Sequence, residues 1–194
     1  MTARPILRNK SMMVSHRFAV CLGLMLSGTG CMATSRLPFA VVLSKYDAPC
    51  FTVNKSFQQA NVLRLFSLQV TEDSSPSWRV LPKTMWSFEA LPIGSSIDWN
   101  PQECIAYGDA PHGVHVENKA LPLETYKIYH LSLTARSHNG DDDVLSHTAR
   151  FCLINDSRGH TVATPIPWDK SSGRWQNEVC DPPDQKIIEK RIQQ

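Results

Sequence analysis

The chain has 194 residues, with 20 Lys and Arg against 18 Asp and Glu, and it contains six cysteines. Four of the basic residues and none of the acidic ones precede Cys31, so a chain beginning at Cys31 keeps 16 basic and 18 acidic residues and a net charge of −2. A nucleic-acid partner requires a clustered basic surface, which this shorter chain lacks apart from Lys190-Arg191, so we expect no nucleic acid to bind. The four early basic residues are Arg4, Arg8, Lys10 and Arg17.

Residues 12–31, MMVSHRFAVCLGLMLSGTGC, show the layout of a secretory signal peptide. Basic Arg17 is followed by nine apolar residues (18–26) and then by four small ones (27–30). Nine residues are too few to span a bilayer, which takes about 20. We therefore expect residues 1–30 to be a cleaved signal peptide, with the true start at Met12 or Met13.

Small residues ending in Gly30-Cys31 resemble the lipobox of bacterial lipoproteins, although Gly28 stands where that motif usually has leucine. In such proteins the cysteine sulfur receives a diacylglycerol and the cysteine becomes the new N-terminus. The resemblance implies lipidation of Cys31, and Met32 after it implies transport to the outer membrane. The alternative is a soluble secreted protein cleaved nearby.

Four cysteines remain after the leader, and an even number in an exported chain predicts two disulfides. They lie 28 to 54 residues apart without Cys-x-x-Cys pairs, so we expect no zinc site and no other metal. Of the three possible connectivities we favour Cys50–Cys104 with Cys152–Cys180, which would cross-link the front and back of the chain separately. A Cys50–Cys180 bond would contradict this division.

In chain order, short apolar or alternating segments bounded by turn residues predict eight strands. They are residues 38–44, 50–53, 62–70, 78–88 (interrupted by Pro82), 103–107, 125–136, 148–155 and 161–166. Asn139-Gly140 predicts a hairpin turn between the sixth and seventh strands. We expect loops at 91–101 and 108–123 and an irregular stretch at 168–180.

About seven to eight short strands without an internal helix predict an all-β, immunoglobulin-like antiparallel β-sandwich. Within the mature chain we expect a lipidated tether at 31–37, the sandwich at 38–180 and a polar tail at 181–194 that is loose or forms a short helix from Gln185. Tyr126, after the turn at 121–125, is similar to the tyrosine corner of such sandwiches, in which the hydroxyl holds the preceding loop.

The sequence lacks the nucleophile, zinc-protease and phosphate-binding motifs, so we expect neither an enzyme nor a cofactor. His112 and His115 lie beside Pro111 and Gly113, which indicates exposed loop histidines rather than a metal pair. Asp141-Asp142-Asp143 is better interpreted as a solvated hairpin tip than as a calcium site. Core packing accounts for most of the five tryptophans, and one or two could contact a partner.

Several short motifs carry a family resemblance in addition to the leader. They are Cys-Phe-Thr-Val at 50–53, Pro-x-Glu-Cys-Ile at 101–105, Tyr-x-Ile at 126–128 and Arg-Phe-Cys at 150–152. With the leader, these motifs resemble a family of small proteobacterial lipoproteins assigned to type VI secretion immunity. The resemblance implies a periplasmic, lipid-anchored protein that binds a toxin, and in that family the cysteines matching Cys50 and Cys104 recur together.

Two functions from different classes follow from these observations. The first is an immunity protein at the periplasmic face of the outer membrane that neutralises a type VI secretion effector by stoichiometric binding. Its partner contacts would lie on the loops at 91–101 and 108–123, with Trp99, His112 and His115 as candidate contact residues. The second is a structural or assembly lipoprotein of the cell envelope without a toxin partner.

Overall fold

Alternation of apolar and polar residues builds the larger of two principal sheets. The computed structural model describes residues 39–45, 48–54, 62–73, 81–137 and 145–183. In β8 (Ile128–Ser137), Tyr129, Leu131, Leu133 and Ala135 are buried, and the intervening residues are partly exposed. This period of two is that of a strand with one face on a core. All these described ranges belong to one compact unit.

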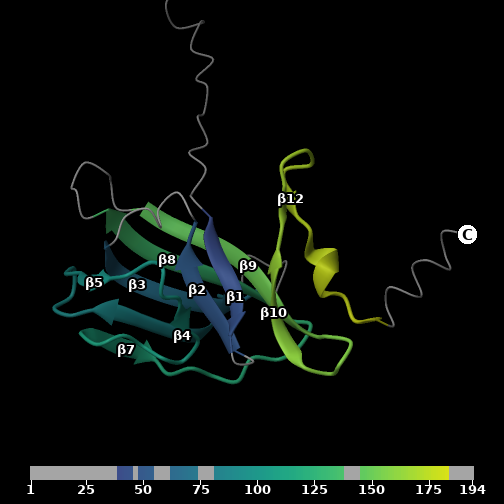
Figure 1. Cartoon of the computed structure of the whole chain (residues 1–194), viewed down its shortest axis with the longest axis horizontal. Coiled ribbons are helices and arrows are strands. Elements are labelled where there is room, and N and C mark those ends of the chain that lie inside the picture. Colours follow the sequence, from purple (N-terminus) through teal and green to yellow (C-terminus); the bar gives the residue numbers. More distant parts are fainter. Residues whose placement is uncertain (1–38, 46–47, 55–61, 74–80, 138–144, 184–194) are drawn as a thin grey trace, which may run out of the picture. The chain divides into compact units, whose positions relative to one another are not determined.

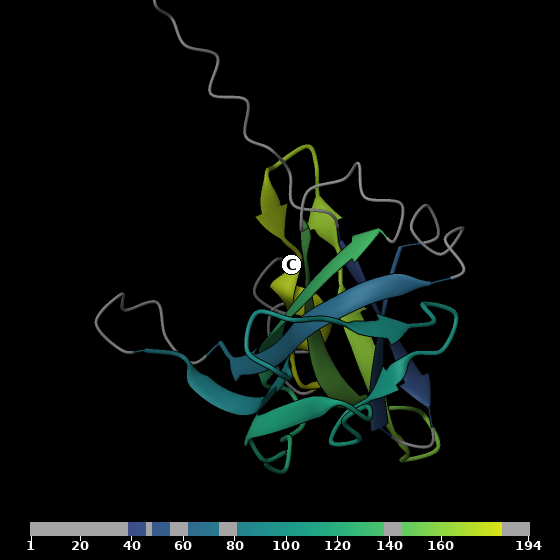
Figure 2. The ribbon, with the colours of Figure 1, turned by 90° about the vertical axis from the view of Figure 1, so that its left-hand side faces the viewer.

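Seven strands form the larger sheet, and their order is β10-β9-β8-β3-β4-β7 with β5 paired to β3 (Figure 1). Every strand pair in it is antiparallel. The bounds are β3 Leu63–Glu72, β4 Lys83–Ala90, β5 Ile97–Trp99, β7 Val114–Asn118, β9 Leu145–Asn155 and β10 Thr161–Ile166. Figure 2 shows this sheet from the side on which β5 and β7 lie.

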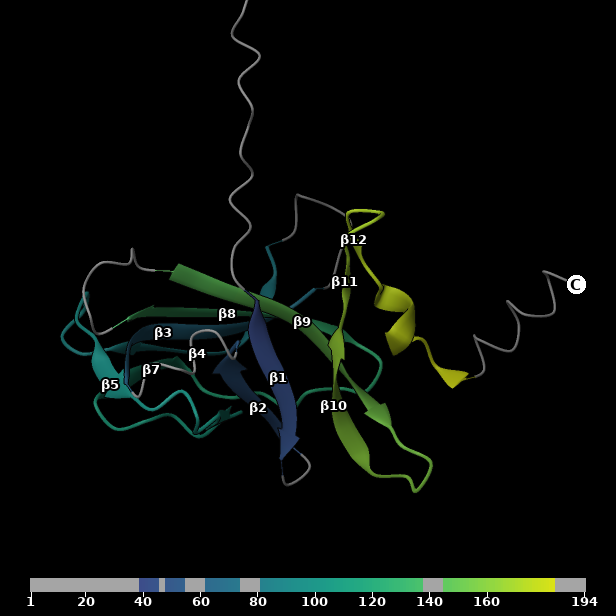
Figure 3. The same ribbon diagram turned by 45° about the horizontal axis from the view of Figure 1, so that its top comes forward.

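A smaller sheet covers one face of the larger one and completes a sandwich. It consists of β1 (Ala40–Lys45), β2 (Ala48–Val53) and β6 (Ile105–Ala106), again antiparallel. β1 and β2 cross over the part of the larger sheet formed by β8, β9 and β10 (Figure 3). Between the sheets lies a single large core that includes Phe51, Trp86, Phe88 and Phe151. The all-β antiparallel sandwich predicted from the sequence is therefore confirmed.

The described chain has twelve strands, more than the seven to eight expected, because several short strands lie where we predicted loops. β5 lies in the predicted loop at 91–101, and β7 lies in the predicted loop at 108–123. The predicted irregular stretch at 168–180 contains β11 (Trp168–Asp169), β12 (Arg174–Trp175) and the 3₁₀ helix η1 (Asn177–Cys180). Of the strand predicted at 78–88, residues 78–80 lie outside the described ranges, and β4 begins just after Pro82.

Both predicted disulfides are present. Cys50 on β2 is bonded to Cys104 with a Cα–Cα distance of 5.4 Å, and Cys152 on β9 is bonded to Cys180 on η1 with a Cα–Cα distance of 5.9 Å. The first bond holds the smaller sheet to the segment that precedes β6. The second holds η1 against β9, where Ile166 and partly buried neighbours form a second, smaller core.

A tyrosine hydroxyl does hold the loop before β8, but it belongs to Tyr129 and not to the predicted Tyr126. The Glu124 backbone N–H donates to the Tyr129 hydroxyl at 2.8 Å, and that hydroxyl lies 3.4 Å from the Glu124 carbonyl oxygen. Tyr126 instead has a positive φ of 64° and its backbone N–H donates to the Leu153 carbonyl at 2.8 Å. The prediction placed the contact three residues too early, because the chain turns at Tyr126 before β8 begins.

Several predicted features lie outside the described residues. These are the signal peptide at 1–30, the lipidation site Cys31, the tether at 31–37, the Asn139-Gly140 turn, the Asp141–Asp143 run and the tail beyond residue 183. The strands that flank the Asn139-Gly140 turn do pair as an antiparallel hairpin, with Ala135 opposite Leu145. None of the helical segments in the described ranges has the length and hydropathy required of a membrane-spanning helix.

Candidate functional site

The predicted loops at 91–101 and 108–123 come together at one end of β4. The backbone N–H of Leu91 donates to the Gly113 carbonyl at 3.1 Å, which joins the loop after β4 to the turn before β7. Gly113 has φ of 85°, and a Cβ atom there would lie 3.0 Å from Cγ2 of Ile97. Glycine therefore permits both the backbone conformation and the close approach of the two loops. We call residues 91–94 and 112–115 the tip.

The tip exposes apolar side chains that contribute little to either core. Leu91 is 52% exposed and Ile93 is 81% exposed, and they flank Pro92 in a loop turned by Gly94 at a φ of 82°. His112, in the turn, and His115, on β7, are both exposed. The predicted contacts His112 and His115 are thus exposed on the turn and strand that adjoin Gly113, whose carbonyl accepts from the Leu91 backbone N–H. Exposed apolar residues gathered in this way are typical of contact surfaces.

Trp99, the third predicted contact residue, is a core residue and does not belong to this surface. It is 7% exposed, and its indole N–H donates to the Glu103 carbonyl at 2.9 Å. The cause is the pairing of β5 with β3, which places Trp99 opposite buried Leu63 on the inner face of the sheet. An indole in that position has little surface to offer a partner, so we correct its assignment.

A groove lies along the middle of β3, the second half of β4 and the adjoining part of β7, on the outer face of the larger sheet. Its volume is about 290 Å³. The lining residues are Ser67, Leu68, Gln69, Ser87, Phe88, Glu89 and Glu117. Ser87 is 3% exposed; its hydroxyl donates to Oε2 of Glu117 at 3.1 Å and accepts from Nδ2 of Asn118 at 2.8 Å. These contacts position Glu117 at the groove, whose charged lining residues are both carboxylates.

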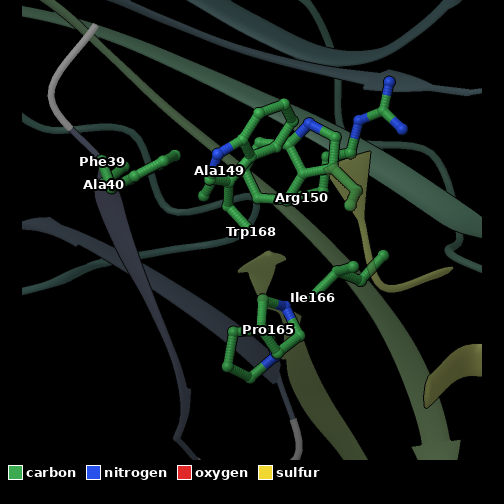
Figure 4. A pocket seen from close by; sticks show the side chains of 9 residues that line it. Phe39, Ala40, Ala149, Arg150, Pro165, Ile166 and Trp168 are labelled. Carbon is green, nitrogen blue, oxygen red and sulfur yellow. The ribbon is translucent and has the colours of Figure 1, made fainter. Parts of the chain in front are cut away.

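A separate pocket of about 240 Å³ lies at the other edge of the sheet, where β1 begins and β10 ends. Phe39, Pro165 and Trp168 converge on it (Figure 4), and Trp175 completes its aromatic lining. Trp168 and Trp175 are directly opposite on β11 and β12, with ring centroids 5.3 Å apart. Phe39 meets Trp175 edge to face at 5.6 Å. The pocket is suited to an apolar side chain.

Among the described residues that line this aromatic pocket, Arg150 is the charged one, and it already has partners. Its Nη2 lies 3.2 Å from Oδ2 of Asp73, and its guanidinium carbon lies 5.7 Å from the centroid of the Trp175 ring. Burial, followed by the repulsion of Arg150, lowers the pKa of His130, which is paired with Arg150 on the adjacent strand. The three polar groups Asp73, Arg150 and His130 thus form a structural cluster behind the pocket.

The remaining perturbed groups belong to the scaffold. Burial lowers the pKa of His147 to about 4 and raises that of Tyr107 to about 12. The Tyr107 hydroxyl lies 2.8 Å from the Leu121 carbonyl oxygen and 3.0 Å from that of Met85, so it fixes the segment after β7. Within the described part of the chain, no group of three His, Cys, Asp or Glu side chains could hold a metal ion.

Sequence reasoning missed Leu91, Ile93 and the aromatic lining of the second pocket. A signal for the first two was present: the segment Leu91-Pro92-Ile93-Gly94 places apolar residues in a turn, where there is no strand face to bury them. The Trp168–Trp175 pair had no comparable signal, because it depends on a two-residue pairing across a turn. The chain matches no protein-family model, no curated protein and no solved structure.

Proposed function

We propose that this protein is a lipid-anchored periplasmic immunity protein that neutralises a type VI secretion effector by one-to-one binding. The observation that carries the proposal is the tip, where Leu91 and Ile93 are exposed beside His112 and His115. An inhibitor of this kind requires a rigid scaffold and a specific contact surface. The disulfides and the antiparallel sandwich provide the rigid scaffold, and the loop-to-loop contact at Gly113 supports a defined contact surface.

The anchor and the compartment belong to the same proposal. Lipidation of Cys31 would hold the domain at the periplasmic face of the outer membrane, where it meets an incoming effector that acts on wall or membrane. Two disulfides are compatible with an oxidising compartment of this kind. The resemblance to type VI immunity lipoproteins supports the choice of partner class.

The test uses residues 32–194, which contain the whole compact unit, and the effector encoded beside this gene. We expect a one-to-one complex in calorimetry, and we expect Ile93→Ser to weaken it about tenfold because a buried aliphatic contact is lost. Leu81→Ser is the matched control. Leu81 is also an exposed aliphatic residue, at 89%, but it lies before the start of β4, whereas Ile93 lies after the end of β4. Both variants should unfold at the same urea concentration as the parent.

The cellular arm of the test removes the gene. Deletion should sensitise cells to siblings that deliver the neighbouring effector. Returning the parent gene should restore resistance, and returning the Ile93→Ser gene should restore less of it. If the deletion strain survives such co-culture as well as its parent does, the protein is better explained as a structural lipoprotein of the envelope.

A further inference from the structure

β7 is the terminal strand of the larger sheet at the edge nearest the tip. One side of β7 pairs with β4, from Ala90 opposite Val114 to Ser87 opposite Asn118. On its other side no strand of the described ranges pairs with it. The backbone N–H and C=O groups on that side can therefore form main-chain hydrogen bonds with an added strand. Such an edge is the feature that β-strand addition uses.

β7 also has features that protect an exposed edge strand from pairing with arbitrary strands. β7 is only five residues long, its register with β4 shifts between Ser87 and Phe88, and Glu117 places a carboxylate on it. Irregular register and a charge both oppose pairing with arbitrary strands. The charge also gives specificity, because a strand with the opposite charge at the facing position is attracted and a strand with the same charge is repelled.

The groove beside β7 extends this charge selection. Its two charged lining residues, Glu89 and Glu117, are both acidic, and the hydroxyl of buried Ser87 holds Glu117 in place. Glu89 is paired with His115 across β4 and β7, so the groove is continuous with the tip. The groove lies on the β4 side of β7, so a strand added at the free edge would reach these carboxylates with a long side chain laid across the outer face of β7, and it would have Leu91 and Ile93 exposed at the tip.

We infer that the partner binds by adding an extended segment to the free edge of β7, with a basic side chain over Glu89 and Glu117 and an apolar one against Ile93. The inference rests on the proposed function, since it describes how the effector would be recognised. It also gives the recognised chemistry: an extended segment in which lysine or arginine alternates with aliphatic residues. The competing explanation is that Glu117 only protects the edge, in which case no strand adds to β7.

The probes are capped hexapeptides, titrated into residues 32–194 and followed by calorimetry and by amide hydrogen exchange. We expect a peptide of alternating lysine and valine to bind at least about tenfold more tightly than one of alternating glutamate and valine, because favourable charge pairs are replaced by repulsive ones. Binding should slow amide exchange within β7 and leave it unchanged in β10. A lysine–valine peptide methylated on its backbone nitrogens should not bind, since it cannot donate to the edge.

Variants separate strand addition from general attraction to an acidic surface. Glu117→Gln should weaken the lysine–valine peptide about fivefold. Glu178→Gln should not, because Glu178 is an exposed acid on η1, which packs against β10 at the other edge of the sheet. Equal binding of the methylated and unmethylated peptides, or no binding at millimolar concentration, would overturn the inference. Neither result would contradict the proposed function, because the effector could still bind through the tip alone. In that case Ile93→Ser would still weaken effector binding.

Discussion

His147 is a titratable residue on the core face of a strand. The register of β9 places it opposite Leu133, on the same face as buried Ala149 and Phe151, and it is 1% exposed. Burial disfavours the charged imidazolium, so the pKa of His147 falls to about 4 from its ordinary value of 6.5. The residue is therefore neutral in the folded protein at neutral pH.

This buried histidine predicts a loss of stability in acid. In the unfolded chain His147 has its ordinary pKa, so between pH 6.5 and pH 4 the unfolded state binds a proton that the folded state does not. The free energy of unfolding should fall over this interval by about 3 kcal/mol at most. Above pH 6.5 the contribution is constant.

Urea denaturation at pH 7 and at pH 4.5 measures this effect. In His147→Leu the free energy of unfolding should depend less on pH than in the parent protein. His130→Gln should reduce this pH dependence by a smaller amount. The difference arises because His130 is partly exposed on the outer face, although its pKa is also lowered. Identical pH profiles for the parent and for His147→Leu would show that the histidine is protonated in the folded state without cost.

The Tyr129 hydroxyl gives a second prediction at this scale. Tyr129→Phe removes the acceptor for the Glu124 backbone N–H and should lower the free energy of unfolding by about 1 kcal/mol. Tyr126→Phe is the matched control, because it removes the hydroxyl that the sequence pattern predicted to hold this loop. Urea unfolding at pH 7 measures both. If Tyr126→Phe costs as much as Tyr129→Phe, the loop before β8 is not held by Tyr129 alone.

At the scale of elements, the C-terminal segment depends on one disulfide more than on its own strands. β11 and β12 have two residues each, and among the described strands they pair with each other alone. Trp175 contacts the rest of the domain through Phe39 and Arg150, while Cys180 fixes η1 to β9. A two-stranded element of this length is unstable alone, so its position follows from the covalent link and the second core.

Removing that link should loosen this segment selectively. The double variant Cys152→Ala/Cys180→Ala opens a loop of 28 residues and should cost about 4 kcal/mol in the free energy of unfolding. Amide exchange should accelerate in residues 168–175 and remain slow in β3. Cys50→Ala/Cys104→Ala is the matched variant; it should lower stability similarly and leave exchange at 168–175 little changed. Unchanged exchange at 168–175 in the first variant would contradict this role of the bond.

Strand patterns in the sequence were sufficient for the long strands and insufficient for the short ones. β8, β9 and β10 could be predicted because alternation over six or more residues distinguishes a strand from a loop. β5 and β7 could not, because three to five residues flanked by proline and glycine carry too little periodicity. The same limit explains the error at Trp99: without β5 it looked like a loop residue, and only its pairing with Leu63 makes it part of the core.

At the scale of the whole domain, the two edges of the larger sheet have different surfaces. The β7 edge carries the exposed aliphatic tip and an acidic groove. The β10 edge carries the aromatic pocket, next to which the described chain begins at Phe39. The two surfaces are separated by the strands of one antiparallel sheet, whose other face packs on the large core. A partner bound at the β7 edge therefore leaves the β10 edge accessible.

The anchor proposed for Cys31 decides whether this domain acts at a membrane. Two or more acyl chains hold a protein stably on a bilayer, where a single chain would release it. We expect the parent protein to fractionate with membranes and Cys31→Ala to appear in the soluble periplasmic fraction, with both disulfides still formed. Cys21→Ala is the matched control, because Cys21 lies within the apolar run of the leader and should leave fractionation unchanged. If Cys31→Ala stays with membranes, acylation at this cysteine is not what holds the protein there. If it becomes soluble and still protects cells from the neighbouring effector, binding strength rather than anchoring limits neutralisation.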